Sequence, residues 1–165
     1  GMLNGNSLFW RIMNEVFFED LKPGQIFSSK TIRVDAGEIT SFATKYDPQP
    51  FHLDEATARN TFFRGLAASG WHTAALTMKL LVESDFKPAG GFIGAGLEEL
   101  RWPKPVRPGD ELRMTVEILE VRSSRSKPHQ GIAKIKTTTL NQYDKAVQIY
   151  IAQIIVLGRK KNLQP

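Results

Sequence analysis

The segment from Ser69 to Glu83 constrains the fold of this 165-residue chain more than any other. It reads as a helix with almost no charged residue before Lys79, so we expect it to be buried along most of its length. Small residues are frequent in and just before its first turns: Ala67, Ala68, Ser69, Gly70, Ala74 and Ala75. They permit close approach of another backbone. A thin, apolar helix in mid-chain is best covered by a sheet that curls around it.

Four candidate strands follow this helix with no further helix between them. They span residues 92–102, 111–121, 132–140 and 147–157. The second of them alternates apolar and polar residues until the phase flips after Ile118, which predicts a β-bulge. Together with one earlier strand, they predict an α+β fold with an antiparallel sheet.

The earlier part of the chain predicts that first strand, at 26–34, and two helices. Asp35 can cap the first helix, which should end near Tyr46 because Pro48 disfavours helix in the residue before it. Asp54 can cap a second, short helix that runs through Phe62. Since no repeat, low-complexity tract or linker interrupts the chain, we expect a single domain over 1–165.

The composition excludes several classes of protein. There is no cysteine, which rules out disulfides, thiolate metal sites and a cysteine nucleophile. The three histidines are scattered without zinc-site spacing, so we expect no metal. No apolar run approaches the roughly 18 residues that span a bilayer, so we expect no membrane insertion. Residues 8–12 do not resemble a signal peptide, and we expect a cytoplasmic protein.

The formal net charge of +5 is concentrated in one window, 101–136. Nine basic residues against four acidic ones leave 9 − 4 = +5 there. Such a window is compatible with a phosphorylated ligand, with nucleic acid or with an ordinary solvated sheet face. It lacks the interleaved aromatic residues of a single-strand binder, so we expect no nucleic-acid partner.

The strongest candidate for chemistry is the segment 46–54, which holds Asp47 and His52 five residues apart. Two prolines, Pro48 and Pro50, fix the path of the backbone between them. Acid–base catalysis depends first on such placement. Asp-Pro also opens ordinary turns, and a lone histidine beside an aromatic residue also occurs in cores, so the residue types alone leave both interpretations open.

The wider stretch 42–72 strongly resembles the MaoC-like dehydratases, the family of (R)-specific enoyl-CoA hydratases. Their signature runs aspartate, any residue, asparagine, proline, aliphatic residue and histidine, followed by a small-residue segment that opens the central helix. Asp47, Pro50 and His52 match this signature. Gln49 stands in place of the asparagine, however.

Two further features concern the extent of this resemblance. Phe51 replaces the family's aliphatic residue. The segment 102–110, Trp-Pro-Lys-Pro-Val-Arg-Pro-Gly-Asp, looks like the family's turn before a long strand. The resemblance covers the core of the domain, about 18–157.

The resemblance implies a hotdog fold, in which a curved antiparallel sheet wraps around a long central helix, and a homodimer or higher homo-oligomer. It implies hydration or dehydration of a 2-enoyl-CoA, with Asp47 as general base and His52 orienting the water or completing proton transfer. The thioester oxygen is expected near the backbone N–H groups of Ser69 and Gly70, at the positive end of the helix. Coenzyme A enters only as part of the substrate, and no other cofactor is expected.

Two other functions remain open at this stage. A thioesterase of the same fold would use a carboxylate to attack the thioester carbon itself. A non-catalytic acyl-thioester binding module would need neither group, and the longer amide of Gln49 could displace Asp47 or His52. Gly70 could equally be a packing glycine, and we interpret His72 as structural.

Overall fold

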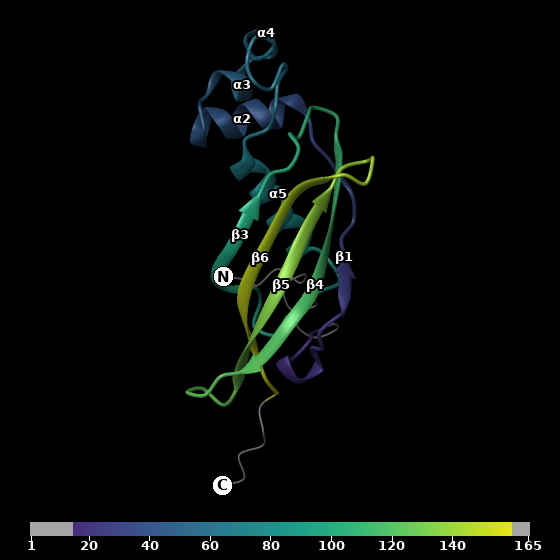
Figure 1. Cartoon of the computed structure of the whole chain (residues 1–165), viewed down its shortest axis with the longest axis vertical. Helices are drawn as coiled ribbons and strands as arrows, with labels where there is room; N and C mark the ends of the chain where they lie inside the picture. Colours follow the sequence, from purple (N-terminus) through teal and green to yellow (C-terminus); the bar gives the residue numbers. More distant parts are fainter. Residues whose placement is uncertain (1–14, 160–165) are drawn as a thin grey trace, which may run out of the picture.

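The computed structural model describes residues 15–159, so the segment 8–12 lies outside the described part. Its main feature is an antiparallel sheet with the strand order β1-β4-β5-β6-β3, while β2 pairs with β4 (Figure 1). The strands are β1 (Ile26–Ser28), β2 (Ile32–Arg33), β3 (Ile93–Arg101), β4 (Glu111–Ser123), β5 (Gln130–Leu140) and β6 (Ala146–Leu157). The four predicted strands in the second half of the chain are confirmed, as is the β-bulge, which lies between Ile118 and Glu120.

The central helix α5 (Gly70–Val82) packs on one face of this sheet. Apolar side chains of β4 alternate into the core beneath it, from Leu112 to Ile118, and are fully buried. The Thr77 and Thr139 hydroxyl groups lie 2.7 Å apart and tie α5 to β5. The predicted arrangement of an antiparallel sheet around a mid-chain helix is therefore confirmed.

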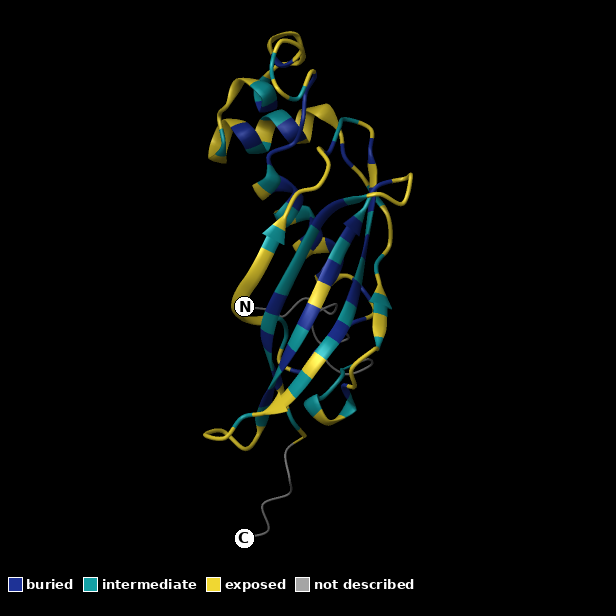
Figure 2. Cartoon of the chain, viewed as in Figure 1, coloured by how far each residue is buried: buried dark blue, intermediate teal, exposed yellow. Residues whose placement is uncertain are grey.

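The side of α5 that faces away from the sheet is not covered within one protomer. Trp71 is 59% exposed and Met78 is 41% exposed, so the expected burial of the helix along most of its length is wrong for the single chain. The neighbouring edge strand β3 is exposed over almost its whole length (Figure 2). An apolar helix face and an unpaired strand edge thus lie together on one side of the molecule.

The remaining helices gather at one end of the sheet (Figure 1). They are α2 (Ala36–Tyr46), α3 (Pro50–Leu53) and α4 (Glu55–Ala58), and a 3-10 turn, η1 (Phe18–Asp20), precedes β1. The Asp35 carboxylate accepts the Glu38 N–H at 2.7 Å, which confirms the predicted cap of α2. Every helix of residues 15–159 is too short or too polar to cross a membrane.

Three local features differ from the sequence-based expectations. The strand expected over 26–34 is split into β1 and β2, because the Ser29 hydroxyl accepts the Met114 N–H at 2.8 Å and interrupts the backbone ladder. The helix that Asp54 caps ends at Ala58, whose carbonyl accepts both the amide and the hydroxyl of Thr61. Residues 50–53 form a helical turn, α3, where only a loop was expected.

Candidate active site

Asp47 and His52 are positioned by two successive helix ends. Asp47 directly follows the last residue of α2 and caps its end, and its N–H donates to the Ala43 carbonyl at 2.9 Å. Pro50 begins α3, where its fixed backbone torsion suits the first helical position and no N–H is needed. One turn of helix then turns the His52 side chain inward, where it is 5% exposed. The two prolines thus set a compact path that brings the two side chains together.

The imidazole of His52 has a defined tautomer. Its Nδ1 lies 2.6 Å from the Ala67 carbonyl oxygen, and because a carbonyl can only accept, Nδ1 carries the proton. In the neutral ring, Nε2 is then an acceptor. This Nε2 lies 3.3 Å from Oδ2 of Asp47. Phe51 packs edge-on against the ring, with centroids 4.6 Å apart, and restricts its orientation. Two acceptors therefore face the same small volume.

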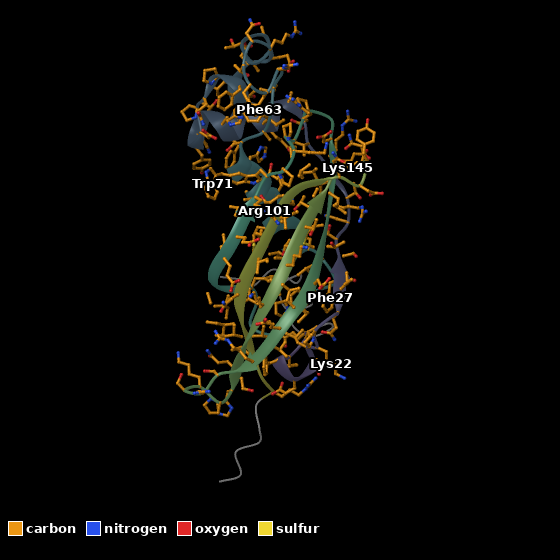
Figure 3. All side chains as sticks on the ribbon, in the orientation of Figure 1. Lys22, Phe27, Phe63, Trp71, Arg101 and Lys145 are labelled. Carbon is orange, nitrogen blue, oxygen red and sulfur yellow. The ribbon has the colours of Figure 1, made fainter. Side chains whose placement is uncertain are left out.

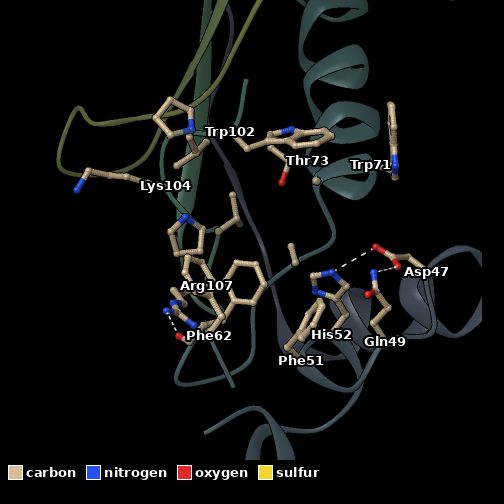
Figure 4. A pocket seen from close by; sticks show the side chains of 17 residues that line it. Asp47, Gln49, Phe51, His52, Phe62, Trp71, Thr73, Trp102, Lys104 and Arg107 are labelled. Atoms are coloured by element: carbon tan, nitrogen blue, oxygen red, sulfur yellow. Dashed lines mark hydrogen bonds and ion pairs between the residues drawn. The ribbon is translucent and has the colours of Figure 1, made fainter. Parts of the chain in front are cut away.

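Gln49 supports this pair instead of displacing it. Its amide donates to Oδ1 of Asp47 at 2.6 Å, which leaves Oδ2 directed at His52 (Figure 4). Partial burial acts to raise the pKa of Asp47, but hydrogen bonds from Gln49 and Ser69 hold this pKa below its usual value of 3.8, and the charge of His52 lowers it further when the ring is protonated. The carboxylate is therefore ionised at neutral pH.

Both side chains line a cavity with a volume of about 680 Å³. Its floor includes buried Ala68, Thr73 and Val147, while Phe62, which is 91% exposed, and Lys104 stand at its rim. Figure 4 shows the Asp47–His52 pair on one side of this cavity and Lys104 on the other.

Ser69 and Gly70, the predicted substrate-binding residues, occupy different places. Gly70 begins α5 and lines the cavity. Ser69 is fully buried; its hydroxyl caps α5 by accepting the Trp71 N–H at 3.2 Å and also interacts with Asp47. The interpretation of Gly70 as a packing glycine has direct support, since a Cβ there would lie 2.6 Å from the Trp102 indole. The binding role of the two backbone N–H groups stays a prediction.

Sequence reasoning missed two residues of the cavity wall, Trp102 and Arg107. The Arg107 guanidinium donates to the carbonyls of Phe63, Gly65 and Leu66, and so holds the segment that continues to Ala67. Trp102 donates its indole N–H to Gln148 on β6 at 2.8 Å. Both lie in the 102–110 segment, which carried a family likeness but no local signal of these long-range contacts.

The basic window 101–136 is not a single patch in the folded chain. Only Lys104 and Arg107 of its nine basic residues line the cavity. Arg113 pairs with Asp144 at 2.7 Å, and Lys134 pairs with Glu98 at 3.0 Å. Other members lie in the β4–β5 loop, at the end of the sheet opposite the helices (Figure 1). Arg101 lies near Trp71, where the sheet meets the helical end (Figure 3).

Comparisons with known proteins agree on one family. The model of the MaoC like domain matches residues 20–141. The uncharacterized protein YdeM of Bacillus subtilis is 35% identical over 137 residues, which are 83% of this chain and 94% of that protein. The crystal structure of a MaoC-like dehydratase from Rhodospirillum rubrum superposes with a TM-score of 0.86 at 50% identity, over 88% of this chain and 99% of that one.

An (R)-hydratase of A. caviae that is involved in PHA biosynthesis is also similar in structure. Its TM-score is 0.68 at 31% identity, over 84% of this chain and 98% of that one. A Mycobacterium tuberculosis protein with a double hotdog fold superposes with a TM-score of 0.74 at 18% identity, which is a likeness of fold alone. The sheet and central helix described above therefore form a hotdog fold.

Proposed function

The chain belongs to the MaoC-like dehydratase family, and from this membership and the Asp47–His52 geometry we propose that it adds water reversibly to 2-enoyl-CoA thioesters. The observation that carries the proposal is the pair of acceptors, Oδ2 of Asp47 and Nε2 of His52, 3.3 Å apart in the wall of a cavity. A water molecule bound beside this pair can donate a hydrogen to Oδ2 of Asp47 while His52 helps to hold it in place.

In the proposed reaction, this water attacks C3 of the enoyl group through its free lone pair. Asp47 takes a proton from the water as the C–O bond forms, and the electron pair of the double bond moves towards the thioester carbonyl. The proton that Asp47 took is then passed to C2, directly or by way of His52, which restores the thioester and the free carboxylate, so that one water is added across the double bond. His52 orients the water and takes part in the proton transfer. Such a positioned acid–base group typically contributes about 10²–10⁴-fold in rate.

The thioester oxygen, which gains negative charge during attack, needs a donor. The Gly70 N–H is the first of α5, a 13-residue helix whose N-terminus faces the cavity. First-turn N–H groups have no partner within the helix, and the helix dipole favours negative charge there. We assign this N–H to the thioester oxygen, with Ser69 fixing the start of the helix. The reaction changes no overall oxidation state, so the proposal needs no redox cofactor.

Lys104 at the cavity rim is the basic residue best placed to meet the phosphates of coenzyme A. The rest of the 101–136 window is divided among ion pairs and remote loops, so we confine this role to Lys104. Substrate affinity should then weaken as salt rises, because exposed charges are screened beyond about 8–10 Å at physiological ionic strength.

A panel of acyl-CoA substrates tests the proposed function. Hydration removes the enoyl absorbance without releasing thiol, whereas a thioesterase releases thiol from saturated acyl-CoAs. We expect the wild type to hydrate a short 2-enoyl-CoA and to release no thiol. Thiol release as the main reaction would favour the thioesterase alternative. Binding of acyl-CoAs with neither reaction would favour the non-catalytic module.

A further inference from the structure

The indole of Trp102 lines the cavity and bridges two elements, while 41% of the residue's surface is exposed. One face of the ring lies on Gly70 at the start of α5, so close that an added Cβ would lie 2.6–2.7 Å from three ring atoms. Its N–H donates to Oε1 of Gln148 on β6 at 2.8 Å. Figure 4 shows the ring reaching from the strand side of the cavity towards the first turn of α5. The gap between helix and sheet is thus filled at this point.

The hydrogen bond from Trp102 fixes which way the side-chain amide of Gln148 points. This side chain is completely buried, and its Nε2 has no hydrogen-bond partner within residues 15–159. A buried donor without a partner is unfavourable. Because Oε1 faces the indole, the amide is held in the orientation that fixes Trp102. The Trp102 indole is therefore held in place by a hydrogen bond as well as by packing.

A second, mainly apolar cavity lies between α5 and the sheet, lined by residues of α5, β3, β5 and β6. Its volume is about 290 Å³, and it shares no lining residue with the Asp47–His52 cavity. Met78 on α5, Leu97 on β3 and Tyr150 on β6 are among its walls. Trp102 follows β3 directly; β3 contributes Leu97 to the second cavity, and the indole of Trp102 lines the first. An acyl chain that runs from the first cavity along β3 towards the second therefore meets the indole.

We propose that Trp102 is the end wall of the acyl pocket and restricts this protein to short-chain acyl thioesters. The proposal rests on the proposed function for the placement of the thioester beside Gly70. Charged coenzyme A enters past the exposed rim at Phe62 and Lys104, and the acyl group extends towards buried Thr73 and Val147. The indole stops its extension there, although apolar volume is available beyond.

Calorimetric titration with butyryl-CoA and octanoyl-CoA tests the wall without relying on turnover. Added methylene groups favour binding in an open apolar pocket, so a longer chain binds tighter unless a wall excludes it. We expect the wild type to bind butyryl-CoA at least tenfold tighter than octanoyl-CoA. Trp102→Ala should shift this ratio at least tenfold in favour of octanoyl-CoA. Trp102→Phe, which keeps an aromatic ring against Gly70, should give an intermediate ratio and serves if the alanine variant does not fold.

Phe62→Ala is the matched control, because it removes an aromatic ring from the rim of the same cavity. It should change both affinities alike and leave their ratio unaltered. Equal affinities in the wild type, an unchanged ratio in the folded Trp102 variants, or no binding of either ligand would overturn the proposal. Crotonyl-CoA hydration measured on the same samples separates the two claims. If the protein hydrates crotonyl-CoA but the Trp102 variants leave the affinity ratio unchanged, only the role of Trp102 as end wall is contradicted. If the Trp102 variants shift the affinity ratio but the wild type does not hydrate crotonyl-CoA, only the proposed function is contradicted.

Discussion

At the scale of single residues, the pKa of the Asp47 carboxyl group depends on its neighbours. The Gln49 amide donates to Oδ1 of Asp47 at 2.6 Å, and this bond lowers the pKa of the carboxyl group. A folded-state pKa below 3.8 means that these contacts stabilise the fold above that pH. The stabilisation is lost as the pH falls through the folded-state pKa. Gln49, a departure from the family signature, therefore supplies a donor that lowers the pKa of Asp47.

Replacing Gln49 by methionine should raise the pKa of Asp47, because the side chain keeps its length but loses its donor. Carbon-13 NMR titration of the carboxyl group measures this pKa directly. Gln153→Met is a suitable control, since Gln153 donates to Glu98 on the sheet and has no contact with the site. An Asp47 pKa that is the same in wild type and Gln49→Met would show that Gln49 does not tune the carboxylate.

The residue pair was predictable, but its supports were not. Asp47 and His52 are close in sequence, and the prolines between them restrict the path enough to predict that the side chains meet. Trp102 contacts Gly70 and Gln148, which are each more than 30 residues away in the sequence. Contacts at such a separation produce no pattern in the sequence from which they could be predicted. Predicting the pair required only local geometry, whereas predicting its surroundings required the fold.

At the scale of elements, Arg107 couples the 102–110 turn to the segment that orients His52. Its guanidinium holds carbonyls of Phe63, Gly65 and Leu66, and the next residue, Ala67, accepts the His52 Nδ1–H. The Arg107 guanidinium donates to those three carbonyls and to neither Asp47 nor His52, so its role is one of positioning. The fixed fork of donors suits several carbonyls at once, which an ammonium group cannot match.

Arg107→Met should lower the free energy of unfolding by about 1.5–3 kcal/mol, the typical contribution of a hydrogen bond to a charged group. The turnover number should fall more than the Michaelis constant rises, and the His52 Nδ1–H signal in proton NMR should broaden or disappear. Arg113→Met is the matched control, because its partner Asp144 is an exposed carboxylate and such pairs contribute about 0–1 kcal/mol. A retained Nδ1–H signal with normal turnover in Arg107→Met would remove the positioning role.

The helices and strands were largely predictable from periodicity and caps, with errors where side chains compete with the backbone. Asp35 marked the start of α2 and Pro48 its end. The Ser29 hydroxyl takes a ladder bond of β4 and splits the first strand, and Thr61 closes α4 early. The apolar composition of α5 predicted its place in the core but not its exposed face, because sequence does not separate burial by the same chain from burial by another.

At the scale of the whole molecule, the exposed side of α5 and the edge of β3 predict a homodimer. Trp71, Met78 and Leu97 are large apolar residues on this side, and the strand edge has unpaired backbone groups. We expect sedimentation to give a dimer at micromolar concentration. Leu97→Lys should shift the equilibrium towards monomer, because it places a charge among these residues. A wild-type monomer under these conditions would contradict the prediction.

Tyr143→Lys is the control for this variant. Tyr143 is also a large exposed residue, but it lies in the turn between β5 and β6, away from the α5–β3 side. It should leave the mass unchanged. Loss of the dimer in both variants would point to a general effect of added positive charge rather than to an interface on α5 and β3.

The central claim is that Asp47 and His52 activate one water for addition to an enoyl thioester, and hydration of crotonyl-CoA by variants of the pair tests it most directly. We expect Asp47→Asn and His52→Ala each to lower the turnover number by about 10²–10⁴-fold. The double variant should lose little more, because groups that act as a unit are not additive. Circular dichroism should show all three variants folded. Near-normal hydration by folded Asp47→Asn would contradict the account.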